Sequence, residues 1–158
     1  MEEVIDHARQ FVAALPEGVR RVIDLGTGAG VPGLVIADER PEVILTLVDR
    51  RQTRMDALRQ AVAGLGWSER VQVLTAEAEA LARQHEHAGM YDAVVCRGLA
   101  HPQVTAALAR PFLKNGGSLI VSEPPVFDPS RWPESLCREA HFAAPRYAPG
   151  VVVLVATP

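Results

Sequence analysis

The chain has 158 residues, 48% of them hydrophobic, which is enough for one domain with a substantial core and too little for a cofactor domain followed by a separate substrate domain. Its formal net charge of -3 excludes a global positive field that would attract nucleic acid or an anionic membrane. Two widely spaced cysteines, an acidic start and no long apolar run predict a cytoplasmic protein without a disulfide, a metal site or a membrane span.

The first elements lead to a turn that is rich in glycine. Apolar residues at three- and four-residue spacing over 3–15 predict an amphipathic helix, within an N-terminal unit of residues 1–18. An apolar, β-branched run over 21–25 predicts a buried parallel strand that runs into the glycine turn. Pro32 suits the first turn of the next helix, whose positive end would face whatever the turn binds.

The rest of the chain alternates between strands and helices. Further strands are predicted over 43–49, 71–74, 91–96 and 118–122, with a closing pair over 140–147 and 151–157. Helices are predicted over 77–84 and 102–110, and before Gly66 along a face made by Met55, Leu58, Val62 and Leu65. Residues 115–117 read as a turn, and residues 123–138 as an irregular, proline-rich loop at the rim of the site that ends in a short helix.

This alternation predicts a single domain over residues 1–158 with an α/β, Rossmann-like fold. Its sheet should have seven strands, mostly parallel, with a C-terminal antiparallel hairpin and helices on both faces. The closing hairpin is typical of class I methyltransferases, whereas a nicotinamide-binding Rossmann domain more usually ends on a parallel sixth strand.

The glycine turn fits two classes of cofactor. Gly28, Gly30 and Gly33 match the dinucleotide fingerprint, while Gly26, Gly28 and Gly30 match the spacing usual in S-adenosylmethionine enzymes. Asp49, at the end of the second strand, would hold ribose hydroxyls in either case. The turn by itself leaves both cofactors open, and the chain length and closing hairpin favour S-adenosylmethionine.

Six stretches carry a resemblance to a known family. They are residues 24–30, 32–34, 46–49, 78–83, 96–100 and 111–117. Together they resemble the glucose-inhibited division protein B family, bacterial methyltransferases of guanine N7 in small-subunit ribosomal RNA. The glycine turn is generic to class I enzymes, and the Pro-Gly-Leu after it and the arginine after the fourth strand are more discriminating.

The resemblance implies roles for the matching positions. It assigns the glycine turn to the methionine part of S-adenosylmethionine, Asp49 to the ribose, and Ala78 with Glu79 to the adenine edge. Arg97 would sit at the mouth of the site, near cofactor and substrate, as the candidate catalytic residue. The candidate cofactor-binding residues are Asp24, Gly26, Thr27, Gly28, Gly30, Asp49, Arg50, Ala78, Glu79 and Arg97.

The chain departs from the family pattern at several places. Glu77 stands where the family usually has arginine, and Glu123-Pro124 stands where it has a lysine-glycine pair, so a positive rim loses charge twice. The N-terminal helical extension of the family is largely absent, and its basic C-terminal hairpin motif is not evident. These departures keep a small-molecule or protein acceptor open beside ribosomal RNA.

The chemistry expected here makes few demands on side chains. Methyl transfer from a sulfonium is an in-line displacement, in which positioning supplies much of the acceleration. Guanine N7 already carries a free lone pair, so no general base is required. Arg97 follows a buried strand at the end where α/β sheets bind ligands, and it is expected to orient a guanine edge or a phosphate rather than only to pair with an acid.

Other reactive or aromatic side chains have simpler interpretations. Cys96 lacks the neighbouring proline of cytosine-5 methyltransferases and is predicted to be a packing residue. His85 and His87 are predicted to lie in a solvated loop. Glu123 is interpreted as a solvated loop residue, with acceptance of a substrate amine as the alternative, and Trp132 as an aromatic that reaches the substrate.

The only basic cluster follows Asp49 and comprises Arg50, Arg51, Arg54 and Arg59. It either meets RNA phosphate or is the solvated start of a helix. The leading hypothesis is thus an S-adenosylmethionine-dependent methyltransferase acting on ribosomal RNA. A methyltransferase for a small molecule or a protein, a cofactor-binding domain without turnover, and a nicotinamide oxidoreductase are the alternatives.

Overall fold

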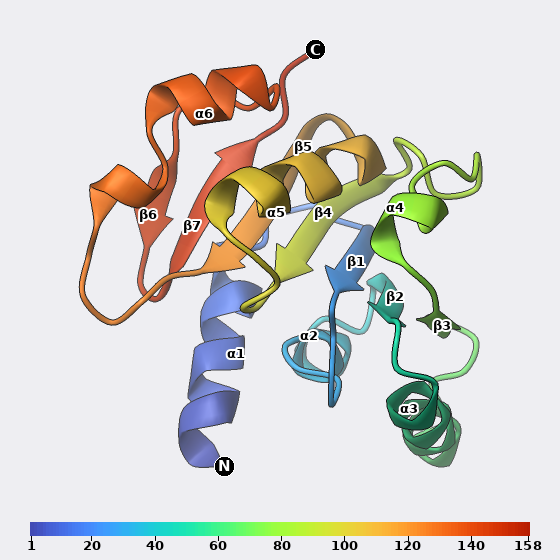
Figure 1. Cartoon of the computed structure of the whole chain (residues 1–158). Coiled ribbons are helices and arrows are strands. Elements are labelled where there is room, and N and C mark those ends of the chain that lie inside the picture. Colours follow the sequence, from blue (N-terminus) through green and yellow to red (C-terminus); the bar gives the residue numbers. More distant parts are fainter.

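The computed structural model describes all 158 residues and contains one seven-stranded sheet in the order β3-β2-β1-β4-β5-β7-β6 (Figure 1). The strands are β1 Arg21–Leu25, β2 Ile44–Asp49, β3 Val71–Thr75, β4 Tyr91–Cys96, β5 Leu113–Ser122, β6 Arg146–Ala148 and β7 Val151–Val155. The helices are α1 Glu2–Ala14, α2 Gly33–Glu39, α3 Gln52–Gly64, α4 Ala78–Leu81, α5 Pro102–Ala109 and α6 Glu134–Glu139. Two short 3-10 helices, η1 Arg110–Phe112 and η2 Pro129–Arg131, complete the chain.

The pairing of the strands confirms the predicted topology. Strands β1 to β5 are parallel to one another, and β7 is antiparallel to both β5 and β6. Parallel strands of this kind are buried on both faces and read as continuous apolar runs, which is why β1 and β4 could be located to the residue. The short β6 and β7 form the predicted C-terminal hairpin.

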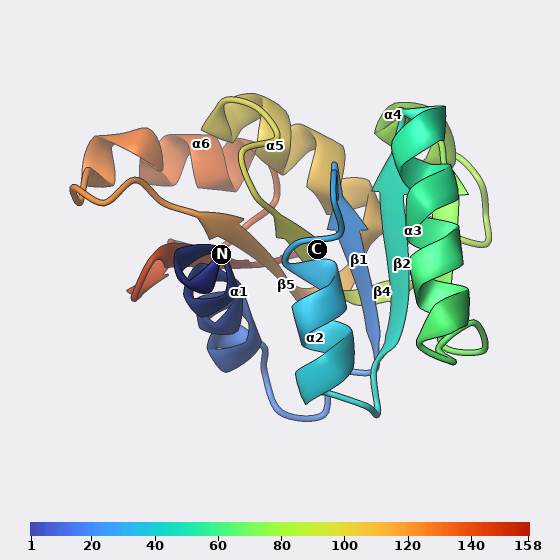
Figure 2. The ribbon, with the colours of Figure 1, turned by 90° about the horizontal axis from the view of Figure 1, so that it is seen from below.

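Helices cover both faces of the sheet, as predicted. Figures 1 and 2 show α1, α2 and α3 on one face and α4, α5 and α6 on the other. Each face buries its own hydrophobic cluster of 19 residues. Because successive side chains of a strand point to opposite faces, Val22 belongs to the first cluster and Ile23 to the second.

Several predicted boundaries differ from the structure. Leu65 is 53% exposed rather than part of the buried face, because α3 ends at Gly64. Pro32 caps α2 and the helix begins one residue later, at Gly33. The helix predicted over 77–84 is reduced to the four residues of α4, and β6 has three residues because only an isolated bridge from Phe142 to Ala156 continues the pairing.

The predicted turn at 115–117 is wrong. These residues belong to β5, which is ten residues long. In the pairing of β4 with β5, Tyr91 lies opposite Leu113 and Ala93 lies opposite Ser118. The two pairs are therefore two residues apart on β4 and five residues apart on β5. The glycine pair therefore forms a bulge within the strand, with Gly116 at φ +84°.

No helix in the structure is long and apolar enough to cross a membrane. The structure also brings together no group of three or more side chains of the metal-ligating types.

Candidate functional site

A cavity of about 560 Å³ lies at the carboxyl ends of the parallel strands. Four connections line it: those between β1 and α2, β2 and α3, β3 and α4, and β4 and α5. The carboxyl edge of an open α/β sheet is where such folds bind ligands. Among the lining residues are Gly26, Thr27, Gly28, Asp49, Arg50, Ala78, Glu79 and Arg97, so eight of the ten candidate residues meet in one place.

The glycine turn approaches the cavity with bare backbone. Gly26 has φ +69° and Gly28 has φ +57°, left-handed conformations that glycine adopts without strain. A Cβ at Gly26 would lie 2.8 Å from the Cδ1 atom of Leu99, so a side chain there would displace that wall of the cavity. The turn is joined to β2 by a hydrogen bond of 3.0 Å from the Thr27 N–H to the Val48 carbonyl.

The other two candidate residues of the turn do not line the cavity. Gly30 instead packs inside the protein, where a Cβ would lie 2.7 Å from Leu34 and 2.8 Å from Leu58. Asp24 is 1% exposed beneath the turn. Its Oδ2 atom accepts hydrogen bonds from the Thr27 hydroxyl at 2.8 Å and from the Gly33 N–H at 2.9 Å. The N-terminus of α2, which was expected to face a ligand, is therefore directed in part at Asp24.

Burial raises the pKa of Asp24 to about 7, although the hydrogen bonds from Thr27 and Gly33 favour the carboxylate. Between the ordinary pKa of aspartate and about pH 7, the folded protein binds a proton at Asp24 that the unfolded chain has already released. The free energy of unfolding should therefore fall as the pH rises through this window, by up to about 1.4 kcal/mol per pH unit. Above about pH 7, Asp24 is ionised in both states, and its effect on the free energy of unfolding no longer changes with pH.

Asp24→Asn removes this titration while keeping an acceptor oxygen. We expect the melting temperature of the wild type, relative to that of Asp24→Asn, to decline from about pH 4 to about pH 7 and then to level off. Asp38→Asn is the matched control, because Asp38 is exposed on α2. Melting curves that stay parallel for wild type and Asp24→Asn across this range would show that Asp24 is ionised throughout.

Asp49, the last residue of β2, lines the cavity. Its Oδ2 accepts a hydrogen bond of 3.0 Å from the Gly28 N–H, and its Oδ1 accepts one of 3.2 Å from the Arg51 N–H. The carboxylate thus ties the glycine turn to the start of α3 while remaining only half-buried. A carboxylate held in this way is preorganised to accept hydrogen bonds from a ligand.

The far wall comes from the start of α4. Ala78 is half-buried and Glu79 is exposed, and the Glu79 carboxylate accepts no hydrogen bond from the protein. Glu77, one of the two departures from the family pattern, also lines the cavity. The other departure, Glu123, does not, so only one of the two changes the charge of this cavity.

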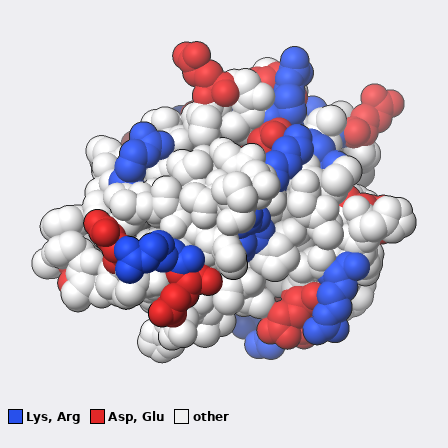
Figure 3. Space-filling view, turned by 90° about the horizontal axis from the view of Figure 1, so that it is seen from above, with Lys and Arg blue, Asp and Glu red and all other residues white.

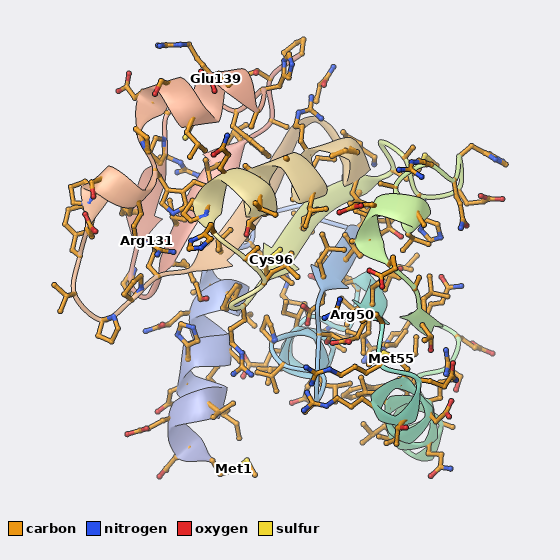
Figure 4. The ribbon with its side chains drawn as sticks, viewed as in Figure 1. Met1, Arg50, Met55, Cys96, Arg131 and Glu139 are labelled. Carbon is orange, nitrogen blue, oxygen red and sulfur yellow. The ribbon has the colours of Figure 1, made fainter.

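Four arginine side chains also line the cavity, three after β2 and one after β4. Arg97 is exposed, lines the cavity and makes no hydrogen bond or ion pair, so the structural pairing considered for it is absent. Arg50, Arg51 and Arg54 are also exposed and line the cavity, and their guanidinium groups make no hydrogen bond or ion pair; Figure 4 shows Arg50 beside the end of β1. Arg59 differs, because it bonds Asp56, the Val73 carbonyl and the Thr75 hydroxyl. The predicted basic cluster therefore splits into three free guanidinium groups and one structural one.

Part of the lining of the cavity could not be expected from the candidate residues. Arg51 and Arg54 were noted only as a basic cluster, and Leu99 and Leu108 were not considered. The arginines could have been found, because residues directly after Asp49 must share its edge of the sheet. Leu108 lies on α5, and its approach depends on how that helix packs, which no local pattern shows.

Two interpretations around Glu123 are wrong. Trp132 is 1% exposed and belongs to the core beneath α6, so it does not reach a substrate. Its Nε1–H donates a hydrogen bond of 2.8 Å to Glu123, and Arg131 pairs with the same carboxylate at 3.4 Å. Glu123 is therefore neither solvated nor free for an amine, since its side chain is only 9% exposed and serves to close a loop.

The predictions for His85 and Cys96 agree with the structure, and the prediction for His87 does not. His85 is exposed as predicted, but His87 is 8% exposed and bonds the Tyr91 hydroxyl at 2.7 Å, so the solvated-loop prediction fails for it. Burial lowers the pKa of His87. Cys96 is fully buried, and burial raises the pKa of its thiol, which confirms a packing role.

The fold and the cavity together define a class I methyltransferase domain. In fold, the chain is similar to PigF with SAH, with a TM-score of 0.75 and 18% identity, covering 99% of this chain and 56% of that one. It is also similar to the mitomycin 7-O-methyltransferase MmcR, with a TM-score of 0.74 and 17% identity, covering 99% and 54%.

The chain belongs to the GidB family, described as rRNA small subunit methyltransferase G, whose family model matches residues 3–122. Ribosomal RNA small subunit methyltransferase G of Deinococcus deserti is 40% identical over 110 residues, which cover 70% of this chain and 45% of the relative. The Moorella thermoacetica protein of the same name is 34% identical over 124 residues, covering 78% and 51%. The predicted family is confirmed, and with it the S-adenosylmethionine class of cofactor over the nicotinamide alternative.

The match to the family is partial in two respects. The chain spans about half the length of the curated relatives it matches. The family match also ends at residue 122, the last residue of β5, so the loop after β5, α6 and the closing hairpin lie outside it.

Proposed function

We propose that the protein is an S-adenosylmethionine-dependent methyltransferase whose acceptor is a guanine N7 of small-subunit ribosomal RNA. The observation that carries this proposal is the cavity at the carboxyl edge, in a chain of the GidB family. Bare glycine backbone, the carboxylates of Asp49 and Glu79, and free guanidinium groups line one connected space.

The residues present fit the cofactor. A Cβ at Gly28 would lie 3.3 Å from the Arg54 Nη1. Because glycine has no Cβ, the backbone at this position stays accessible to a cofactor. Asp49 would hold the ribose, and Ala78 with Glu79 would contact the adenine edge. The buried Oδ1 of Asp24 has no hydrogen-bond partner, which leaves one acceptor free beneath the turn. When bound, S-adenosylmethionine supplies an electrophilic methyl group.

The acceptor needs orientation rather than activation. Guanine N7 has a lone pair in the plane of the ring, so no proton has to be removed before it attacks. A guanidinium that donates to guanine O6 or to a phosphate would hold the base and leave N7 free. Arg97 fits this role because its charge is unpaired at the mouth of the cavity.

We expect Arg97→Ala to lower turnover about 100-fold while leaving the affinity for S-adenosylhomocysteine close to that of the wild type, because misplacement of the acceptor costs rate. Arg97→Lys should recover little of this loss, since an ammonium lacks the planar fork. Arg83→Ala is the matched control, an exposed arginine outside the cavity. Single-turnover kinetics and calorimetry measure both quantities, and unchanged turnover in Arg97→Ala would rule out a role for Arg97 in holding the acceptor.

The free arginines favour a polyanionic acceptor. Four guanidinium groups line a single cavity without ion pairs, in a chain whose net charge is negative. Figure 3 shows the face of α4, α5 and α6, where acidic and basic side chains are mixed around a large uncharged area. A local cluster of this kind suits phosphate contacts. Glu77 favours the second candidate, methylation of a small molecule or protein, because it places a carboxylate in the same cavity.

Two measurements test the proposal. Calorimetry should detect S-adenosylhomocysteine binding and no NAD binding, and the reverse would overturn the cofactor assignment. Labelled methyl should then pass from S-adenosylmethionine to undermethylated small ribosomal subunits, with a metabolite pool and a protein extract as parallel acceptors. Incorporation only into the metabolites or proteins would select the second candidate, and cofactor binding without any transfer would indicate a domain without turnover.

We further propose that residues 1–158 form one methyltransferase domain and that it works in the cytoplasm, where ribosomal RNA is found. The single sheet supports the first statement, because its strands take in residues 21–155 and α1 packs on one face.

A further inference from the structure

The loop that follows β5 is closed at its base. Glu123, its first residue, accepts the Trp132 Nε1–H at 2.8 Å and pairs with Arg131 at 3.4 Å, which joins the two ends of the loop. Asp128 accepts a hydrogen bond of 3.0 Å from the Ser130 N–H at the start of η2. These contacts hold the base of the loop and thereby position the side chains at its tip. The loop lies outside the family match.

The tip exposes apolar side chains that the fold does not use. Val126 is 79% exposed and Phe127 is 63% exposed. The Phe127 ring packs edge to face on Tyr147 of β6, with the ring centroids 4.8 Å apart and the planes at 89°. Tyr147 is itself 37% exposed. A pair of aromatic rings is therefore held at the surface with most of one ring accessible to a ligand.

The pair lies on the edge of the sheet that carries the cavity. Cys96 pairs with Val121 and Ser122 pairs with Val151, so the ends of β4 and β5 and the start of β7 follow one another along this edge. A hollow of about 530 Å³ lies among α1, the start of the loop and the turn from β6 to β7, lined by His7, Gln10, Glu123, Pro124, Pro125 and Gly150. Figure 1 shows the loop beside the turn from β6 to β7, and Figure 4 shows Arg131 there, away from Arg50.

We propose that Phe127 and Tyr147 form a stacking site for an unpaired nucleobase that flanks the methylated nucleotide of the acceptor RNA. The inference rests on the proposed function, because it takes the acceptor in the cavity to be RNA. Proteins recognise single-stranded RNA largely by stacking splayed bases on aromatic rings. Because the cavity and the rings lie on the same edge of the sheet, one RNA strand that follows this edge would contact both.

The local charges favour a base at this site over a phosphate. Asp128 follows Phe127 directly, and its hydrogen bonds from Ser130 lower its pKa, so a negative charge stays close to the rings. Arg146 precedes Tyr147 and is exposed, and Arg131 is already paired with Glu123. This mixture suits a neutral base with a single nearby cation for its backbone.

Replacement of the exposed ring tests the inference without disturbing the core. Phe127→Ala should weaken binding of a short fluorescein-labelled single-stranded RNA, measured by anisotropy with saturating S-adenosylhomocysteine, about five-fold or more. Phe127→Trp should retain the affinity, since tryptophan also stacks. Val104→Ala is the matched control, an apolar side chain on α5 that is 48% exposed and does not line the cavity. With undermethylated small subunits, Phe127→Ala should raise KM and leave kcat unchanged.

The outcomes separate this inference from the proposed function. Wild-type methyl transfer to small subunits, with equal RNA affinity in Phe127→Ala and Val104→Ala, would overturn the stacking site and leave the function standing. Weaker RNA binding in Phe127→Ala without transfer by the wild type would support the stacking site and overturn the acceptor. A concentration-dependent dimer of the wild type in sedimentation, lost in Phe127→Ala, would show that the rings contact a second copy of the chain instead.

Discussion

Gly33→Ala should destabilise the protein by about 3 kcal/mol and lower the melting temperature by roughly 10 °C. The added Cβ would overlap the Cδ2 methyl of Leu47, which is fully buried in β2, and would lie 2.9 Å from the Oδ2 of Asp24. Neither neighbour can move freely, because Leu47 belongs to the core and Asp24 is held by Thr27. The close approach of α2 to the sheet, rather than backbone strain, is what requires glycine here.

Gly64→Ala is the matched control for this prediction. Gly64 is the last residue of α3, and a Cβ there meets no atom within 4 Å. Alanine in that open helical position should leave stability unchanged or raise it by about 0.5–1 kcal/mol. Thermal and urea unfolding of the two variants compares them directly. If Gly33→Ala unfolded at the same urea concentration as Gly64→Ala, the tight contact of α2 with β2 would be contradicted.

Asp49→Ala should lower the affinity for S-adenosylhomocysteine at least about 10-fold, because hydrogen bonds to a charged carboxylate are worth about 1.5–3 kcal/mol each. The substitution removes the group proposed to hold the ribose and also releases the Gly28 N–H and the Arg51 N–H. Titration calorimetry measures the loss. Asp49→Asn should lie between the wild type and Asp49→Ala, since an amide oxygen can still accept the Gly28 N–H.

Asp56→Ala provides the comparison for Asp49→Ala. Asp56 is an exposed acid of α3 that bonds Gln52 and Arg59 and does not line the cavity. Its loss should leave the affinity for S-adenosylhomocysteine within about two-fold of the wild type, because an exposed ion pair contributes little. Wild-type affinity in Asp49→Ala would mean that the ribose is held elsewhere, and the assignment of Asp49 would fail.

Elements with a clear local pattern could be predicted closely. Strands β1 and β4 were predicted with the bounds that the structure has, because parallel strands buried on both faces appear as uninterrupted apolar runs. The glycine turn and Asp49 could be placed together because the turn follows β1 and Asp49 ends β2, and both strands belong to one parallel sheet. Boundaries failed where the chain leaves a regular pattern, as at the bulge of β5 and the three-residue β6.

Contacts between distant residues account for the side chains that were misinterpreted. Glu123 and Trp132 both looked like surface residues of a proline-rich loop, and their hydrogen bond joins positions nine apart. His87 bonds the Tyr91 hydroxyl, which in turn donates to Thr46 across the intervening strand β1, and this polar chain accommodates the buried imidazole. Phe127 went unnoticed because its exposure depends on the closed base of the loop and on its contact with Tyr147.

The class of fold, the position of the glycine turn and the family could all be predicted from the sequence, because each is carried by residues that are near one another along the chain. Which charged groups stay free and which the protein itself pairs became clear only from the packing. Asp24, Arg59 and Glu123 are engaged, while Arg50, Arg51, Arg54 and Arg97 are left for a ligand. Whether a charged side chain is engaged depends on the partners within hydrogen-bond distance. Those partners are brought there by the packing of helices and strands that are remote in sequence.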